Sequence, residues 1–458
     1  MTRRGQSVTV RPGPGSLPDV RDDAPGPSRR RRLNRALRVL GPGLITGAAD
    51  DDPSGIATHS QSGAQYGFQI LWTVIFTLPL MVAVQEACMR IGAVTGQGLA
   101  AVVRRTYSRK VLYPVVLLAV AANCLNIGSD LGAMAASAQL LLPAVPILPL
   151  SIGFALVIVA LEVFVSYRIY IRVLKWLSLA LFAYVITAFF VNVPWSKALL
   201  ATVIPQVQFN GSFLYLLVAV LGTTISPYLF FWQTSNVVED EIAENRKNDD
   251  DSTTAPRISL GYLRRLRVDT VIGMLFANLI AWFIMLVGAV VLHTGGVTTI
   301  STAAEAAAAL RPLVDTFPNA GLLAEVIFAV GVVGVGLMSV PVLAGSSAYA
   351  IAETFGWREG LSRRFTQARG FYITIILGTL FGMTFNFLGI NPIQALVATA
   401  VFNGLVAVPL IFVIIRVSGR ADVMGEFRTR FWSKLGLWIT FLVMAAAAVA
   451  LVVSLIPR

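Results

Sequence analysis

Long apolar segments separated by short polar ones run along almost the whole 458-residue chain. Each segment is close to or above the roughly 20 residues that a helix needs to cross a bilayer. Because the segments are continuously apolar and do not alternate with polar residues, they predict helices and not the strands of a membrane barrel. The segments lie near 38–63, 67–94, 111–142, 148–167, 171–193, 212–235, 268–292, 319–352, 370–386, 391–415 and 434–456. The pattern therefore predicts an all-α polytopic membrane protein with eleven transmembrane helices.

The overall composition agrees with this pattern. The chain is 56% hydrophobic and 13% charged, with a mean hydropathy of +0.73, whereas an ordinary soluble domain carries about 25% charged residues. Little sequence remains outside the spans for a soluble domain. The two cysteines, Cys88 and Cys124, both lie in apolar segments, so neither a disulfide framework nor a cysteine metal cluster is indicated.

The basic residues orient the spans. If the N-terminus is cytoplasmic and the chain changes side at each span, only Lys197, Arg311 and Arg458 of the 36 lysines and arginines lie outside. One missed span would destroy this asymmetry. The positive-inside rule therefore predicts a multi-pass protein of the plasma membrane with a cytoplasmic N-terminus and an outer C-terminus. Basic loops beside an anionic leaflet also account for the net charge of +12, so no nucleic-acid partner is expected.

Three consecutive carboxylates interrupt the first predicted span. The stretch GAADDDPSGIATHSQSG at 47–63 contains Asp50, Asp51 and Asp52 directly before Pro53. Insertion scales assign a penalty of roughly 2.5–3.5 kcal/mol to each aspartate at the centre of a span. Protonation, a water-filled cavity or a bound cation can offset that penalty. We favour a functional cation site.

The sixth predicted span holds a second candidate break, TTISP, in which Pro227 follows Ser226. Asp52 and Ser226 are both of the residue types that cap helix N-termini, and proline is favoured at the first helical position. Two helices broken at matching positions are typical of inverted-repeat transporters, which bind their substrate between the breaks. The alternative for TTISP is a lone proline kink whose freed carbonyls are satisfied by hydroxyl groups.

The paired breaks divide the chain into repeats. The prediction is a disordered basic cytoplasmic tail followed by a 5+5 inverted repeat with broken helices 1 and 6, and by an appended helix 11. The tail has no apolar core and is therefore not a signal peptide. The expected divisions are the tail 1–37, helices 1–5 in 38–193, helices 6–10 in 194–415 with a mobile acidic cytoplasmic loop at 239–257, and helix 11 in 416–458.

Unwound backbone at Asp52–Gly55 would free carbonyl oxygens beside the carboxylates. Carboxylate, carbonyl and hydroxyl oxygens are hard ligands that suit Mg²⁺, Mn²⁺ or Ca²⁺. The candidate metal ligands are Asp51, Asp52, Gly55, Thr223, Thr224 and Ser226.

Several further ionisable residues are candidates for a proton pathway or for support of the site: Asp50, His59, Glu86 and Asp130. His59 follows Asp52 by seven residues, so it either shares that helix face or lies at the outer mouth. Asp130 has small neighbours that permit close packing. It is therefore the best candidate for a proton relay or a second charge near the site.

Several motifs of this chain resemble those of the NRAMP (natural resistance-associated macrophage protein) family of divalent-metal transporters. The matching segments are GPG at 41–43, Asp-Pro at 52–53, YGFQILW at 66–72, RIGAVTGQGLA at 90–100, SDLG at 129–132 and LAGSSAYAIAETFGW at 343–357. The resemblance covers essentially the whole chain from about residue 40. It implies a leucine-transporter-like fold and import of Mn²⁺ or Fe²⁺, usually coupled to protons.

The resemblance also implies where the family's metal ligands fall. Asp52 stands at the ligand aspartate of the DPGN motif, but Gly55 replaces its asparagine. Ser226 replaces the ligand methionine of helix 6. Tyr228 replaces the following histidine and is therefore a further candidate for a proton pathway or for support of the site. Asp130 is kept, whereas Ala133 replaces the acidic residue after it. Loss of the soft thioether shifts the site toward harder ions, as in the magnesium-handling branch of the family, and the other two losses argue against proton coupling.

The predicted function is a secondary transporter of divalent cations, with Mn²⁺ or Mg²⁺ as the expected cargo. We expect alternating access, no cofactor apart from the substrate ion, the lipid bilayer as a further partner, and a monomer. Transport coupled to protons and transport of the metal ion alone both stay open. The alternative is a Na⁺- or H⁺-coupled organic-solute (amino-acid) carrier of the same fold. A channel is a second alternative. A membrane enzyme is disfavoured, since the chain has only two histidines and no nucleophile motif with a base in reach.

Overall fold

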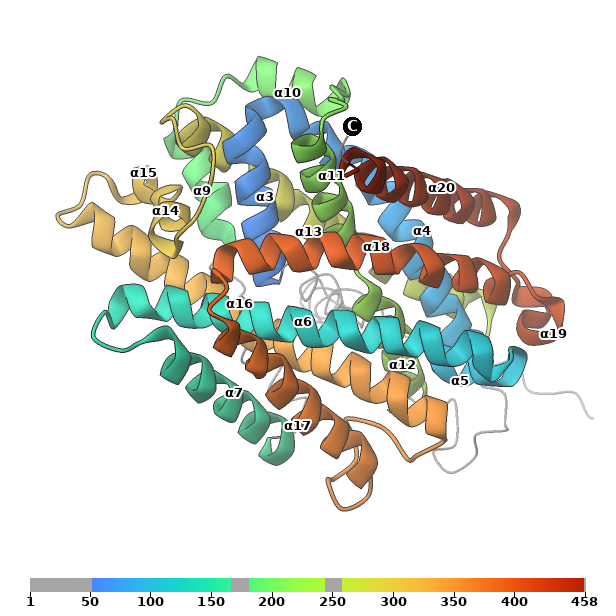
Figure 1. Ribbon diagram of the computed structural model, residues 1–458. Coiled ribbons are helices and arrows are strands. Elements are labelled where there is room, and N and C mark those ends of the chain that lie inside the picture. The colour runs from blue at the N-terminus through green and yellow to red at the C-terminus, as the bar shows by residue number, and fades with distance from the viewer. Residues whose placement is uncertain (1–51, 166–180, 244–257, 457–458) are drawn as a thin grey trace, which may run out of the picture. The chain divides into compact units, whose positions relative to one another are not determined.

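The computed structural model describes residues 52–165, 181–243 and 258–456, and Figure 1 shows the order of its helices. These described ranges contain helices and turns but no strand. The longer helices are α3 (Pro53–Tyr66), α4 (Trp72–Thr95), α6 (Arg109–Leu141), α7 (Ile147–Phe164), α11 (Gly211–Thr224), α12 (Pro227–Ala243), α13 (Leu260–Val287), α16 (Ala320–Phe355), α17 (Arg369–Thr384), α18 (Pro392–Ser418) and α20 (Phe431–Ser454). The all-α prediction is confirmed.

Shorter helical elements connect or extend the long ones. They are η1 (Gly67–Ile70), α5 (Leu99–Thr106), α9 (Phe182–Phe190), α10 (Trp195–Val203), the π-helix η3 (Gly288–His293), α14 (Ala303–Ala308), α15 (Arg311–Val314), η4 (Phe385–Leu388), α19 (Ala421–Met424) and η5 (Gly425–Phe427).

Nine helices within the described residues are long and apolar enough to cross a membrane. They correspond to nine of the eleven spans that the sequence predicts. The two other predicted spans, 38–63 and 171–193, extend into residues outside the described ranges, and α3 and α9 are their described parts. The predicted tail 1–37 also lies outside the described residues.

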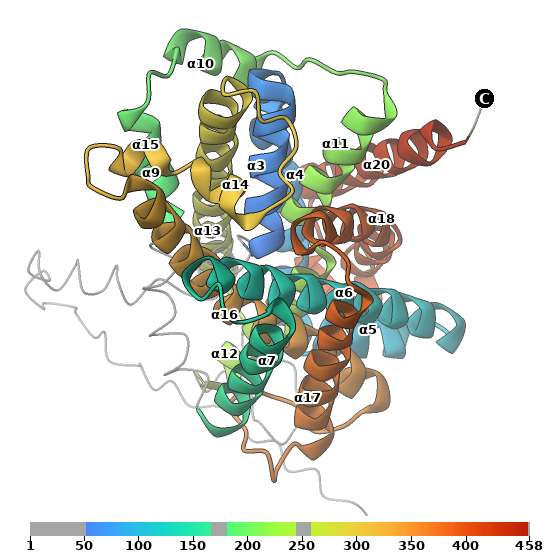
Figure 2. The same ribbon diagram turned by 60° about the vertical axis from the view of Figure 1, so that its left-hand side comes forward.

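The helices differ in how much of their surface is buried. The α11–α12 pair is 89% buried over its most apolar window, and α16 is 72% buried, whereas α7 and α20 are only 17% and 22% buried. In both views α7 lies beside α17, and α6 lies between these two helices and the interior (Figures 1 and 2). The α11–α12 pair and α16 therefore belong to the interior, and α7 and α20 belong to the periphery.

The sixth span is broken where the sequence predicts. Helix α11 ends at Thr224, Ile225 leaves the helical conformation with φ −114° and ψ 60°, and α12 begins at Pro227. On the first span, α3 begins at Pro53 with Asp52 as its N-cap. Both proline signals thus mark helix starts, and the alternative of a lone kink within a continuous sixth helix is wrong.

One predicted loop is shorter than expected. Residues 239–243 of the predicted acidic loop 239–257 form the last turn of α12. The Glu239 carboxylate accepts hydrogen bonds from the Tyr349 hydroxyl and, at 2.6 Å, from the Leu361 backbone N–H. These contacts tie the end of α12 to α16 and to the segment that follows it, so helix continues past the predicted boundary. Residues 244–257 lie outside the described ranges.

Candidate functional site

Asp52 is buried at the start of α3, with only 1% of its surface exposed. Its Oδ1 accepts hydrogen bonds from the Gly55 backbone N–H and from the Ser54 hydroxyl, both at 2.7 Å. Its Oδ2 has no hydrogen-bond partner among the described residues. The carboxylate is therefore held in one orientation by its first oxygen, which leaves the second oxygen available for a ligand.

The predicted unwinding of Asp52–Gly55 is wrong for most of that segment. Pro53, Ser54 and Gly55 form the first turn of α3, and the Ile56 N–H donates to the Asp52 carbonyl at 3.1 Å. An aspartate N-cap followed by proline at the first helical position stabilises a helix start, which explains the difference. Asp52 is the residue of this segment that departs from helical geometry.

A side chain just after the start of α3 lies close to a side chain at the end of α11. The Ser54 hydroxyl on α3 lies 3.4 Å from the Thr223 hydroxyl on α11, although 169 residues separate them. Thr223 and Thr224 are both buried in the last turn of α11. Sequence reasoning named the threonines but missed Ser54, whose place directly after an N-cap and a proline was the available signal.

Ser226 is buried in the break but does not point its hydroxyl toward α12. The hydroxyl donates to the backbone carbonyls of Thr223, at 2.6 Å, and Gly222, at 3.0 Å. It therefore satisfies two carbonyls at the end of α11, which a helix terminus otherwise leaves without partners. The carboxyl end of α11 carries the negative end of the helix dipole, which favours a cation in this region.

Asp130 on α6 lies within electrostatic range of Asp52. It is fully buried, its Oδ2 accepts a hydrogen bond from the Ser339 hydroxyl of α16 at 3.2 Å, and its Oδ1 has no partner among the described residues. The structure thus brings a second carboxylate near the first break, as the sequence suggests. Ser339 is a supporting residue that sequence reasoning did not name.

His59 lies at the end of the second turn of α3, the helix that Asp52 caps. Its Nδ1 lies 2.7 Å from the Gly55 carbonyl oxygen, and its Nε2 has no partner among the described residues. Only 4% of the side chain is exposed. The Gly55 carbonyl is thus already occupied by a ring nitrogen, which makes it a weaker ligand candidate than Asp52.

Glu86 and Tyr228 have other contacts. Glu86 on α4 forms ion pairs with Arg90 at 2.7 Å and with Arg267 at 3.3 Å. Tyr228, fully buried in the first turn of α12, accepts a hydrogen bond on its backbone carbonyl from the Ser346 hydroxyl at 2.7 Å. Neither contact includes Asp52 or Asp130, so their predicted roles in the site stay predictions.

The ligand chemistry of the described part of the site is dominated by neutral oxygens. Asp50 and Asp51 lie outside the described residues. Within the described ranges, no group of three or more His, Cys, Asp or Glu side chains gathers to hold a metal ion. A cation between the breaks would therefore meet one or two carboxylates together with hydroxyl and carbonyl oxygens, a set that suits a hard and partly hydrated ion.

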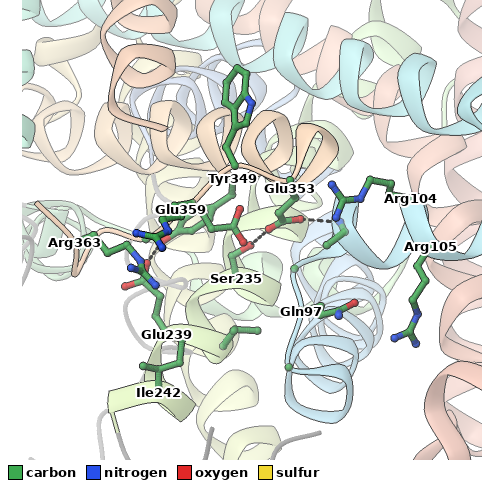
Figure 3. Close-up of a pocket in the computed structure, with 18 residues that line it drawn as sticks. Gln97, Arg104, Arg105, Ser235, Glu239, Ile242, Tyr349, Glu353, Glu359 and Arg363 are labelled. Carbon is green, nitrogen blue, oxygen red and sulfur yellow. Dashed lines mark hydrogen bonds between the residues drawn. The ribbon is translucent and has the colours of Figure 1, made fainter. Parts of the chain in front are cut away.

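A polar pocket of about 520 Å³ lies where α4, α12 and α16 end (Figure 3). Glu353 of α16, only 3% exposed, lies on its wall and accepts hydrogen bonds from three donors. They are the backbone N–H groups of Ala100, at 2.8 Å, and Ala101, at 3.1 Å, and the Ser235 hydroxyl, at 2.7 Å. A Cβ at Gly98 would lie 1.7 Å from the Glu353 carboxylate, so a larger residue there would displace this side chain from its hydrogen bonds. This carboxylate joins α5, α12 and α16.

Replacement of Glu353 by alanine is expected to lower the thermal unfolding midpoint in detergent. Two buried donors and one part-buried donor would lose their acceptor, at about 1–3 kcal/mol for each that finds no other partner. The matched control is Glu305→Ala, which removes a carboxylate that accepts from the Ser301 and Thr302 N–H groups at the exposed start of α14. If both variants lowered the midpoint equally, the structural role assigned to Glu353 would be wrong.

The chain is similar to a known protein family over most of its length. A family model described as natural resistance-associated macrophage protein-like matches residues 43–454. The divalent metal cation transporter MntH of Deinococcus radiodurans is 27% identical over 443 residues, which cover 91% of this chain and 92% of that protein. MntH of Brucella suis is 24% identical over 458 residues, which cover 97% and 92%.

Solved structures show the same fold. A manganese transporter of Eremococcus coleocola superposes with a TM-score of 0.70 at 17% identity, over 96% of this chain and 91% of that one. MhsT, solved with L-phenylalanine, superposes with a TM-score of 0.57 at 15% identity, over 90% and 98% of the two chains. The predicted leucine-transporter-like fold is confirmed, and helix 6 is broken between α11 and α12; of helix 1, the described part is α3. Because the family match spans nearly the whole chain, this multi-pass membrane protein belongs to the natural resistance-associated macrophage protein-like family, whose members are transporters and not enzymes.

Proposed function

We propose that the protein is a secondary transporter that carries divalent metal cations across the membrane by alternating access. The observation that carries the proposal is the buried Asp52 carboxylate, held by Ser54 and Gly55 with its Oδ2 open, directly beside the carboxyl end of α11. Buried charge of this kind is costly unless something compensates it. A divalent cation between the two breaks supplies that compensation, and relatives over nearly the whole chain are divalent metal cation transporters.

The ligand chemistry favours Mg²⁺ or Mn²⁺ as the cargo. The candidate ligands Asp52, Thr223 and Thr224 offer oxygen alone, and Ser226 stands where the family resemblance places a thioether. Oxygen ligands suit hard ions, whereas sulfur favours softer transition metals. Asp51 remains a predicted ligand, and Asp50 a predicted supporting charge.

Uptake into proteoliposomes tests this function. Saturable uptake of Mn²⁺ or Mg²⁺, accelerated by the same ion on the opposite side, supports a carrier; flux that does not saturate would indicate a channel. Binding of an amino acid in place of metal would support the organic-solute alternative. That alternative is disfavoured because Asp52 would repel a carboxylate substrate.

The chemistry around Asp130 favours transport without proton coupling. Tyr228 and Ala133 stand where the family resemblance places a histidine and an acidic residue, so Asp130 keeps neither of these titratable neighbours. Metal entry should therefore leave the lumenal pH unchanged. Acidification that depends on Asp130 would show symport instead.

The proposed topology follows from the basic residues. We infer a cytoplasmic N-terminus, an outer C-terminus and location in the plasma membrane, with the repeats at 38–193 and 194–415. The pocket lined by Glu353 then lies on the cytoplasmic side. Labelling of single cysteines introduced at Lys197 and at Arg358 in intact cells tests this orientation, because the reagent should reach only the first.

Replacement of Ser226 by methionine is expected to shift preference toward Mn²⁺. A thioether at the break would stabilise Mn²⁺ relative to Mg²⁺, and a tenfold change in preference corresponds to about 1.4 kcal/mol. The measurement is Mn²⁺ uptake in competition with increasing Mg²⁺. Ser226→Leu is the control, since leucine has a similar size but no sulfur. Equal behaviour of the two variants would show that the sulfur has no role.

A further inference from the structure

Two buried asparagines of the interior lack hydrogen-bond partners. Asn126 on α6 is 0% exposed and Asn403 on α18 is 1% exposed. Within the described part of the chain, neither polar atom of the Asn126 amide has a partner, and neither does Nδ2 of Asn403. An unsatisfied buried polar group costs about 1–3 kcal/mol. Amides at such positions therefore require a ligand or water to explain them.

The two amides lie at the same level of the bundle. Helices α6 and α18 run side by side in opposite directions (Figure 1), and the Ser129 and Thr399 hydroxyls on them are 3.1 Å apart. Asn126 is one turn before Ser129, and Asn403 is one turn after Thr399. Because the helices are antiparallel, both steps lead toward the same end of the bundle.

That level coincides with the break in the sixth span. Gly222 packs so closely on α18 that a Cβ would lie 2.0 Å from the Ala400 carbonyl oxygen and 2.4 Å from the Gly404 nitrogen. Around α18, Asn403 lies about 40° from Thr399, on the side of Ala400, and therefore between the faces that contact α6 and α11. Asn403 is thus placed beside the residues that follow Gly222, which form the break.

Asn126 is placed toward the same region from α6. It lies about 40° around the helix from Asp130 and one turn along from it. Asp130 in turn lies within electrostatic range of Asp52. The two amides are therefore placed beside the space between the breaks, one from α6 and one from α18.

We propose that Asn126 and Asn403 form an amide pair that binds the transported divalent cation through its hydration shell. This inference rests on the proposed function and adds two residues to its site. The pair makes up for Gly55, which stands where the family resemblance places an asparagine. Amide groups offer both an oxygen acceptor and an N–H donor, and Mg²⁺ usually keeps several of its waters when protein-bound. The pair thus favours a hydrated ion.

The test replaces each asparagine with leucine, which has a similar volume and no polar atom. Calorimetric titration of the purified proteins with Mg²⁺ should show binding weakened about 10–100-fold in each variant, the range for residues that act around a metal. The matched control is Asn123→Leu on α6. The Asn123 amide donates to the Ser347 hydroxyl and the Leu343 carbonyl, at 2.9 and 3.3 Å, so its loss should lower stability and leave Mg²⁺ affinity unchanged.

The outcomes separate this inference from the proposed function. If wild type binds no divalent cation, or if Asp52→Asn binds it normally, the proposed function fails. If Asp52 is required but Asn126→Leu and Asn403→Leu bind Mg²⁺ as wild type does, only the amide pair is disproved. Should the leucine variants fail to fold, Asn126→Ser and Asn403→Asp decide. Weaker binding in the first and tighter binding in the second support the pair, and unchanged binding in both overturns it.

Discussion

Replacement of Asp52 by asparagine should abolish saturable metal uptake and leave the protein folded. Asparagine still caps a helix N-terminus and can accept the Gly55 N–H hydrogen bond, so α3 keeps its start. The variant loses the negative charge and the open carboxylate oxygen. Metal affinity should fall at least about 100-fold, which corresponds to about 2.7 kcal/mol. Calorimetry with Mn²⁺ and Mg²⁺, together with proteoliposome uptake, measures both effects.

A second helix cap provides the control for this experiment. Asn210 caps α11 by accepting the Phe213 N–H at 2.8 Å. Asn210→Ala removes the cap at the end of α11 that lies opposite the break. It should therefore lower stability by about 0.5–2 kcal/mol and leave metal affinity unchanged. Full uptake by Asp52→Asn would show that Asp52 is not the metal ligand, whatever the effect of the control.

Local sequence signals were sufficient to predict the spans and the breaks. Continuous apolar runs of sufficient length have few alternatives in a bilayer, and aspartate or serine before proline is a strong helix start. The sequence therefore predicts correctly that Asp52 caps one helix and that Pro227 begins another. The predicted unwinding of Asp52–Gly55 is wrong in one respect, because Pro53–Gly55 belong to the helix that Asp52 caps.

Contacts between distant segments could not be predicted in this way. The bond between Glu353 and the start of α5 joins residues more than 250 positions apart. Ser54 approaches Thr223 because of the way α3 packs on α11. Asn403 is placed beside the break because of the way α18 packs on α11. A continuous apolar run identifies a helix in the membrane but carries little information about which neighbour it contacts, since lipid and protein are both apolar.

Replacement of Gly222 by valine is expected to prevent α11 from packing on α18. The new Cβ would lie 2.0 Å from the Ala400 carbonyl oxygen and 2.4 Å from the Gly404 nitrogen, and both are backbone atoms that no side-chain rotation can move. The helices would have to separate, at a cost of at least about 1–3 kcal/mol, and Thr223 would move with α11. The yield of monodisperse protein and its thermal midpoint in detergent measure the loss.

The same substitution at Gly153 on α7 isolates this clash from the general effect of valine in a helix. A Cβ at Gly153 meets no atom within 4 Å, and α7 is only 17% buried. Gly153→Val therefore keeps the change in helix propensity without the backbone contact, and it should fold with nearly the wild-type midpoint. Equal losses in the two variants would mean that valine itself is responsible. A loss confined to Gly222→Val, with weaker metal binding in the protein that still folds, would show that close packing of α11 on α18 positions the break.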